Sequence, residues 1–230
     1  MCSVKFTIFT PTYNRAHTLH RVYESLLAQT LNGFEWLVVD DGSTDTTPEL
    51  LIHLQKRVGK AFPIRYVVLE RNRGKHIAHN RALKEARGEF LLVADSDDWI
   101  VPNALERMDY HWSKLPDKTD YCGVAGLCAD RNGNIIGTRY TDAMTHSTLA
   151  ERKFVHHMKG EHWGFVRMDI ARDYPFPDDI DGFVPEALVN LAIAKKYKDY
   201  CVNEVFRIYS TAEIKKPPQA WNRRGLRGLS

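Results

Sequence analysis

The feature that most constrains the fold of this chain is the alternation of short apolar runs with helical patterns over about its first 115 residues. Four runs have the composition of β-strands: Val4–Phe9, Phe34–Val39, Ile64–Leu69 and Phe90–Ala94. A helical pattern follows each of them. Strands that alternate with helices pair in parallel and need helices on both faces of the sheet. The pattern therefore predicts an α/β fold with an open, mainly parallel sheet.

The helices between these strands are marked by apolar spacing and by the residues at their ends. The expected helices are Leu19–Leu27, a segment with Thr47 as its N-cap and Pro48 at its first position, Ile77–Arg87 with Gly88 as its C-cap, and a segment opened by Pro102. Each carries apolar residues at helical spacing, which is the face expected to pack on the sheet.

The second half of the chain has a different order and predicts a smaller region beside the sheet. The expected elements are a hairpin of Tyr121–Ala129 and Ile135–Arg139 around a turn at 130–134, a helix Ser147–Met158, a strand His162–Met168, a helix Pro185–Tyr197 and a strand Tyr200–Ile208. The inward face of the helix 185–197 is expected to be Ala187, Leu188, Leu191 and Ala194. We divide the chain into residues 1–115, 116–212 of the same domain, and a basic tail at 213–230.

Charge and cysteine content restrict the function classes. The net charge is only +3, and the tail at 213–230 holds five basic residues against one acid, so the rest of the chain is close to neutral. A neutral body argues against nucleic-acid binding, whereas the tail suits an anionic membrane face. The four cysteines form no C-x-x-C pair, which excludes a zinc ribbon and favours reduced thiols. We expect a cytoplasmic protein, without a signal peptide or membrane span, that contacts the inner membrane face through its tail.

Charged residues follow the predicted strands at the edge where an open α/β sheet binds ligands. Asp40 and Asp41 follow the second strand, the basic loop Arg71–Lys75 follows the third, and the acidic run Asp95–Asp98 follows the fourth. Since parallel strands end at the same edge, these groups are expected to converge there.

The acidic run Asp95-Ser96-Asp97-Asp98 indicates a metal site. Three carboxylates in four residues repel one another unless a cation lies among them. Oxygen ligands without histidine or cysteine suit Mg²⁺ or Mn²⁺, usually shared with substrate phosphates. The alternative is that these acids cap turns or face solvent.

The other two groups suit a nucleotide. A carboxylate at the end of the second strand can accept hydrogen bonds from a base N–H or a ribose hydroxyl, and Asp41 is a better candidate than Asp40. Arg71 and Lys75 lie just before a helix, where basic side chains and free N–H groups bind anions. The chain has no P-loop and no G-x-G-x-x-G, so neither a P-loop NTPase nor a dinucleotide dehydrogenase is supported.

These motifs together resemble glycosyltransferase family 2, over Ser3 to about Leu105. The resemblance rests on Thr10-Pro11-Thr12-Tyr13-Asn14-Arg15, Leu27-x-Gln29-Thr30, Val38-Val39-Asp40-Asp41-Gly42-Ser43, Asn72-x-Gly74 and Asp95-x-Asp97-Asp98. It implies a GT-A fold, which is Rossmann-like, and an inverting nucleotide-sugar transferase. It also implies that Pro11, Tyr13 and Asp41 contact the nucleobase, that Asp95 lies near the ribose, and that Asp97 binds the metal.

The resemblance is weaker in the second half. Many members of the family place an acidic pair at the start of a late helix, with the aspartate as catalytic base. Here the sequence Phe183-Val184-Pro185-Glu186 has one acid, and the resemblance assigns the base to Glu186. The structural alternative is that Glu186 only stabilises the first turn of the helix, through a favourable interaction with the helix dipole. Asp178, Asp179 and Asp181 on the preceding loop are rival bases.

The resemblance therefore implies an inverting hexosyltransferase of the GT-A type. By resemblance, the donor is a UDP-sugar, the cofactor is Mg²⁺ or Mn²⁺, and the acceptor is a glycan or a lipid-linked sugar. One rival is a sugar nucleotidyltransferase, which usually has a glycine-rich loop after its first strand; Thr10–Arg15 has no glycine. The other rival is a non-catalytic module that binds nucleotide-sugars.

Overall fold

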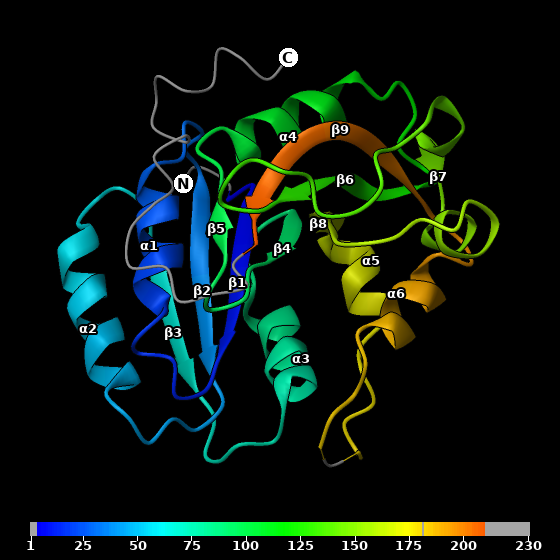
Figure 1. Cartoon of the computed structure of the whole chain (residues 1–230). Helices are drawn as coiled ribbons and strands as arrows, with labels where there is room; N and C mark the ends of the chain where they lie inside the picture. Colours follow the sequence, from blue (N-terminus) through cyan, green and yellow to red (C-terminus); the bar gives the residue numbers. More distant parts are fainter. Residues whose placement is uncertain (1–3, 181, 210–230) are drawn as a thin grey trace.

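Nine strands form one open mixed sheet in the computed structural model, which describes residues 4–180 and 182–209 (Figure 1). The strands are β1 (Phe6–Thr12), β2 (Phe34–Asp40), β3 (Ile64–Val68), β4 (Phe90–Val93), β5 (Trp99–Ile100), β6 (Tyr121–Ala129), β7 (His146–Ser147), β8 (His162–Arg167) and β9 (Lys198–Ile208). The helices are α1 (Leu19–Leu27), α2 (Thr47–Val58), α3 (Lys75–Glu85), α4 (Ala104–Lys114), α5 (Met168–Asp173) and α6 (Ala187–Ile193). A 3₁₀ turn, η1 (Asp142–Met144), and a π-helical turn, η2 (Glu151–Val155), complete the described elements.

The strand order is β3-β2-β1-β4-β8-β6-β9-β5, and β7 also pairs with β9. The first four strands pair in parallel, as the alternation of strands and helices predicts. β8 then joins β4 and β6 in antiparallel pairing, and β6 pairs in parallel with β9. The predicted open sheet is thereby confirmed, with mixed pairing.

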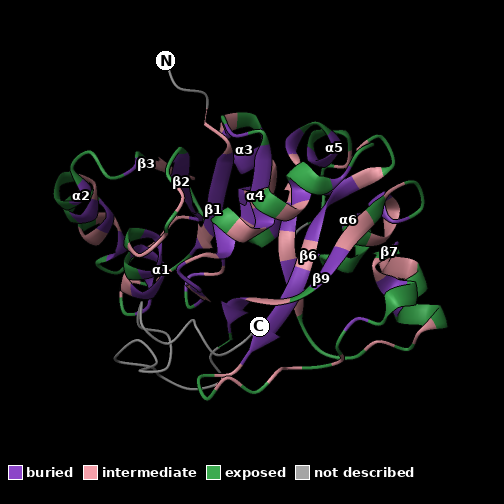
Figure 2. Cartoon of the chain, turned by 90° about the horizontal axis from the view of Figure 1, so that it is seen from above, coloured by how far each residue is buried: buried purple, intermediate pink, exposed green. Residues whose placement is uncertain are grey.

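Helices cover both faces of the sheet, because the central strands are apolar on both sides. β2 is buried along its whole length. On one face Trp36 packs in a cluster with apolar residues of α1, α2 and α4, whereas Leu37 packs on the other face with α3 and α5. Figure 2 shows the buried strands passing between these helices. The layers position the carboxyl ends of β1, β2 and β4 at one edge.

Several element boundaries differ from the expectation by a residue or two. The N-cap of α2 is Thr46, so Thr47 is already helical. α3 begins at Lys75, directly after Gly74, and ends at Glu85. Gly88 is therefore not its C-cap. A Cβ on Gly88 would lie 2.4 Å from the backbone nitrogen of Thr7, so close packing against β1 requires glycine there.

The expected hairpin forms its turn but not its second strand. Asp130 Oδ1 accepts hydrogen bonds from the N–H groups of Asn132 and Asn134, at 2.8 and 2.9 Å. Within the expected second strand, Ile135–Arg139, the only pairings are two isolated bridges, from Ile135 to Ala129 and from Gly137 to Gly160. Gly137 has a φ of 109°, which a continuous strand does not accommodate.

The expected helix Ser147–Met158 is confirmed only in its middle part. Ser147 belongs to β7, which pairs with β9, and residues 149–155, which include η2, are helical. Buried Arg152 draws η2 toward β9, because its guanidinium forms an ion pair with Asp199 at 2.5 Å. Four short elements, β5, β7, α5 and η1, were not expected.

The inward face of α6 differs from the predicted one. Ala194 is buried as predicted, but the other buried residues are Val189 and Ile193, while Ala187 and Leu188 are exposed and Leu191 is partly exposed. The helix is shorter than 185–197, and its buried residues Val189 and Ile193 pack on a small cluster that includes Ile170 and Phe176. The tail at 213–230, with its predicted membrane contact, lies outside the described residues.

Candidate functional site

One cavity of about 410 Å³ lies at the carboxyl ends of β1, β2 and β4. The sequence-predicted residues that line it are Pro11, Tyr13, Asp41, Lys75, Asp95 and Asp97. They come from four separate segments, and the parallel strands bring them together at one edge. Tyr209, which the sequence did not single out, also lines this cavity.

Asp41 shapes the basic loop beside this cavity. Its carboxylate is buried, and its two oxygens accept hydrogen bonds from the N–H groups of Arg73 and Gly74, at 2.9 and 2.7 Å. Gly74 has a φ of 102°, which favours glycine and lets α3 begin at the next residue. Asp41 therefore sets the position of Lys75 through the backbone.

Asp40 has a structural role and does not line the cavity. It is fully buried, and Oδ1 accepts hydrogen bonds from the N–H and the hydroxyl of Ser43 at 2.9 and 2.6 Å. Oδ2 accepts a hydrogen bond from the Tyr66 hydroxyl at 2.8 Å. These contacts use both oxygens and hold the turn after β2.

The three aspartates after β4 have different surroundings. Asp97 is exposed at the cavity, and Asp95 is partly exposed. Asp98 points inward, where Oδ2 accepts a hydrogen bond from the Asp95 N–H at 2.9 Å and lies 3.2 Å from Nη1 of buried Arg207. Burial raises the pKa of the Asp98 carboxyl, and Arg207 opposes that shift. Asp98 thus holds the loop that carries the other two.

Lys75 connects this loop to α6. Its Nζ lies 2.5 Å from Oδ1 of Asp95 and 2.5 Å from Oε1 of Glu186. Burial alone would lower the pKa of Lys75, but the two carboxylates raise it above its usual value. The predicted base and a predicted donor-binding acid are thus joined through one ammonium group.

The loop before α6 is fastened to α3, and this fixes the position of Glu186. Asn80 donates to the Phe176 carbonyl at 2.8 Å and accepts from its N–H at 2.9 Å. Nε2 of buried His76 lies 3.0 Å from the Ile180 carbonyl oxygen, and Arg73 donates to the Asp178 carbonyl at 3.1 Å. The sequence reasoning did not identify Asn80 or His76 as anchors of this loop.

Glu186 is the N-terminal cap residue of α6 and lies between two further cavities. One, of about 540 Å³, is also lined by Arg71, Arg73 and Lys75. The other, of about 260 Å³, lies under α6. Arg71 therefore lines the cavity next to the one that holds Asp41 and Asp95.

Of the rival bases, Asp178 and Asp179 line none of these three cavities, and Asp181 lies outside the described residues.

Asp97 and Asp95 fit a hard divalent cation only in part. Within residues 4–180 and 182–209, no group of three or more acidic, histidine or cysteine side chains could hold a metal ion. Carboxylate oxygens nevertheless suit Mg²⁺ or Mn²⁺, ions that take one or two carboxylates plus substrate phosphates. The donor set thus fits a cation that arrives with a phosphate ligand. In the same described part of the chain, no helix has the length and apolarity needed to cross a membrane.

Sequence comparisons place most of the chain in one family. Residues 7–174 match the family model described as Glycosyl transferase family 2. The succinoglycan biosynthesis protein ExoO of Rhizobium meliloti is 41% identical over 105 residues, which cover 44% of this chain and 28% of that protein. A GalNAc(5)-diNAcBac-PP-undecaprenol beta-1,3-glucosyltransferase of Campylobacter jejuni is 26% identical over 215 residues, covering 89% of this chain and 64% of that protein. The chain thus spans less than two thirds of either relative.

Solved structures show the same fold. TarS of S. aureus in complex with UDP-GlcNAc aligns with a TM-score of 0.66 at 23% identity, over 95% of this chain and 62% of that one. The mannosyltransferase PcManGT of Pyrobaculum calidifontis, in complex with GDP-Man and Mn²⁺, aligns with a TM-score of 0.66 at 23% identity, over 94% of this chain and 59% of that one.

Proposed function

Because the chain belongs to glycosyltransferase family 2, we propose that it transfers a sugar from a nucleoside-diphosphate donor to a hydroxyl group, with inversion at the anomeric carbon. The observation that carries this proposal is the Lys75 ammonium, which joins Asp95 of the donor cavity to Glu186 at 2.5 Å from each. A nucleotide site and a candidate base are thereby neighbours, as a direct displacement requires.

The nucleotide is proposed to bind in the cavity at the ends of β1, β2 and β4. Pro11, Tyr13 and Asp41 line the part of the cavity assigned to the nucleobase, and Asp95 lies where the ribose is expected. Lys75 is proposed to attract the diphosphate, and Arg71 from the adjoining cavity adds positive charge to that side. UDP-GlcNAc bound to TarS supports a uridine nucleotide as donor.

Asp97 is proposed to hold Mg²⁺ or Mn²⁺ together with the donor diphosphate. When bound, the ion would supply neutralisation of the negative charge that develops on the leaving diphosphate. The exposure of Asp97 at the donor cavity and the Mn²⁺ in the PcManGT complex support this assignment.

Glu186 is proposed as the general base. Its carboxylate would take the proton of the acceptor hydroxyl as that oxygen attacks the anomeric carbon from the face opposite the diphosphate. No covalent intermediate is needed, because the displacement is single. Its side chain is 55% exposed and borders two cavities, so an acceptor hydroxyl can reach it.

The acceptor is proposed to be a glycan or a lipid-linked sugar, which the name of the Campylobacter jejuni relative supports. A cytoplasmic location with peripheral membrane contact through residues 213–230 belongs to the same proposal. Co-sedimentation with anionic vesicles should be weaker for a chain that ends at Lys216 than for the full chain. Equal binding of the two forms would refute this contact.

Nucleotide titration tests the donor assignment. UDP, GDP and their sugar conjugates are titrated calorimetrically with and without Mn²⁺, for the unsubstituted protein, Asp97→Ala and, as a control, Glu24→Ala on the exposed side of α1. We expect Asp97→Ala alone to lose the metal-dependent part of the affinity. Metal-independent binding in all three proteins would refute the role of Asp97.

Turnover separates the proposal from its two rivals. The preferred nucleotide-sugar is incubated with the protein and simple sugar acceptors. A glycosyltransferase releases the nucleoside diphosphate, slowly by hydrolysis when no acceptor is present. A nucleotidyltransferase would instead form a nucleotide-sugar from a nucleoside triphosphate and a sugar phosphate. A binding module would retain the conjugate intact.

A further inference from the structure

The cavity under α6 has no role in the donor site. It measures about 260 Å³ and lies between α6 and the strands β4, β8 and β6. Val189, Ile193, Phe176 and Phe165 are among its walls. Glu186 also lines it, so the cavity and the proposed base share a border.

The cavity lies on the acceptor side of Glu186. Lys75 lines both the donor cavity and the neighbouring cavity of about 540 Å³, whereas Glu186 lines the latter and the cavity under α6. The three cavities therefore form a row, with Lys75 at the first junction and Glu186 at the second. If Glu186 is the base, the acceptor hydroxyl lies at this second junction, and the rest of the acceptor must extend away from the diphosphate.

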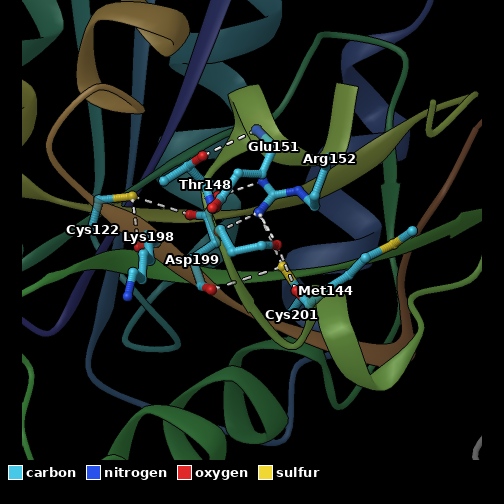
Figure 3. A network of polar contacts seen from close by, with 9 residues as sticks. Cys122, Met144, Thr148, Glu151, Arg152, Lys198, Asp199 and Cys201 are labelled. Atoms are coloured by element: carbon cyan, nitrogen blue, oxygen red, sulfur yellow. Dashed lines mark hydrogen bonds and ion pairs between the residues drawn. The ribbon is translucent and has the colours of Figure 1, made fainter. Parts of the chain in front are cut away.

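The polar groups at the inner end of this cavity are already paired. Arg152 forms an ion pair with Asp199 at 2.5 Å, as Figure 3 shows. It also donates to the carbonyl of Ser147 at 2.7 Å. The thiol of Cys122 donates to the other carboxylate oxygen of Asp199 at 3.1 Å. These groups have little capacity left to bind a polar ligand.

Two histidine rings also line the wall, His79 and His162, and burial lowers the pKa of both. The pKa of His79 falls to about 4, and Lys75 adds to this shift. The His79 ring packs edge-on against Phe176, with their centroids 5.0 Å apart, and Nε2 of His162 lies 2.9 Å from the Thr138 carbonyl oxygen. A polar group that entered here without a partner would lose its hydration and gain no hydrogen bond in return. The cavity therefore selects for an apolar group.

We propose that this cavity binds an apolar group attached to the acceptor sugar, so that the acceptor is amphiphilic. The inference rests on the proposed function, because Glu186 as base defines which side is the acceptor side. The volume fits an aryl ring or a short alkyl chain, since an apolar cavity of about 150 Å³ already binds benzene. Such a group can be an aglycone at the anomeric position or a substituent on the sugar ring.

Saturation-transfer NMR tests this proposal without turnover. The probes are phenyl β-D-glucopyranoside, methyl 2-benzamido-2-deoxy-β-D-glucopyranoside and methyl β-D-glucopyranoside, each added to the full chain with UDP and Mn²⁺. We expect the aryl protons of one of the first two to receive strong saturation and the methyl glycoside to receive little. The probe that responds distinguishes an aglycone from a ring substituent.

Three variants of α6 locate the effect. Val189→Phe fills the cavity, and Asn190→Phe covers its mouth from an exposed position that should not disturb folding. Leu188→Phe is the matched control, because Leu188 is 54% exposed and does not line the cavity. We expect the first two to lower the aryl saturation at least fivefold and the control to keep it, with UDP affinity equal in all.

Two results would overturn the inference. One is the absence of aryl saturation in the unsubstituted protein while UDP binds. The other is aryl saturation that survives both Val189→Phe and Asn190→Phe. A protein that binds the aryl probe but transfers no sugar would instead refute the proposed function, so the two failures are distinguishable.

Discussion

The ammonium of Lys75 lies 2.5 Å from Oε1 of Glu186, so a residue of the donor side holds the proposed base of the acceptor side. The same ammonium lies 2.5 Å from Asp95. A positive group between two carboxylates keeps them close where they would otherwise repel. The arrangement implies that donor binding and base position are linked through one side chain.

Glu186→Gln should abolish most transfer while leaving nucleotide binding intact. Glutamine keeps the shape of the side chain but cannot accept the proton. Loss of a general base typically costs about 10²–10⁴-fold in rate. Glu186 does not line the donor cavity, so UDP affinity should change little. Transfer rate and calorimetric affinity measured on the same samples check both parts.

The matched controls for this variant are Asp178→Asn and Asp179→Asn, on the loop that precedes α6. Both should retain near-normal turnover, because neither residue lines the three cavities. If Glu186→Gln is active and one of these two is inactive, the base belongs to the loop and the assignment of Glu186 is wrong.

Lys75→Met should impair both binding and transfer. The substitution keeps most of the apolar stem but leaves Asp95 and Glu186 without their shared partner. A hydrogen bond to a charged group contributes about 1.5–3 kcal/mol, and solvent screening at this half-exposed site reduces that figure. We expect UDP affinity to fall about tenfold and turnover to fall at least as much. Lys75→Arg should recover part of the affinity, whereas unchanged binding in Lys75→Met would contradict the proposed contact with the diphosphate.

Arg207→Met should destabilise the fold through Asp98. The pair is buried, and removal of one partner leaves an uncompensated charge, which costs about 3–5 kcal/mol. The double variant Asp98→Leu with Arg207→Met should be more stable than Arg207→Met alone, since no charge remains unpaired. Urea unfolding of the two variants measures the difference. Equal stabilities would mean that the ion pair contributes nothing to the donor loop.

His79 should make the stability of the protein depend on pH. Burial lowers its pKa from 6.5 to about 4, so below pH 6.5 the unfolded chain binds a proton that the folded protein does not yet bind. The folded state thus keeps its full stability above pH 6.5 and loses up to roughly 3 kcal/mol as the pH falls to about 4. His79→Phe should remove most of this loss. Unfolding curves at pH 7 and pH 4.5 for both proteins test it, and identical pH dependence would refute the role of His79.

The first half of the fold was predictable because local sequence signals decide it. β2 is apolar along its whole length, and its buried faces follow directly from that composition. The second half depends on contacts between distant residues. Arg152 ties η2 to Asp199, 47 positions away, and no local pattern indicates this contact. The inward face predicted for α6 was confirmed only at Ala194, because the helix packs on the cluster around Ile170 and Phe176.

The site was predictable where residues follow parallel strands, because the topology alone places Asp41, Asp95 and Asp97 at one edge. What holds them there was not predictable. Arg207 reaches Asp98 across 109 positions, and Asn80 holds Phe176 across 96. Nothing in the sequence next to Arg207 or Asn80 indicates these contacts, so only the folded chain identifies them.

The pairing of β5 with β9 means that the two described halves of the chain, residues 4–115 and 116–209, are not separable modules. β5 comes from the first half of the chain, yet its partner is the last described strand, and β8 of the second half completes the edge of β4. A chimera that exchanged only residues 116–209 with a relative would have to reproduce two inter-half strand interfaces. Substitution of side chains around α6 leaves both interfaces in place, whereas exchange of a whole half does not.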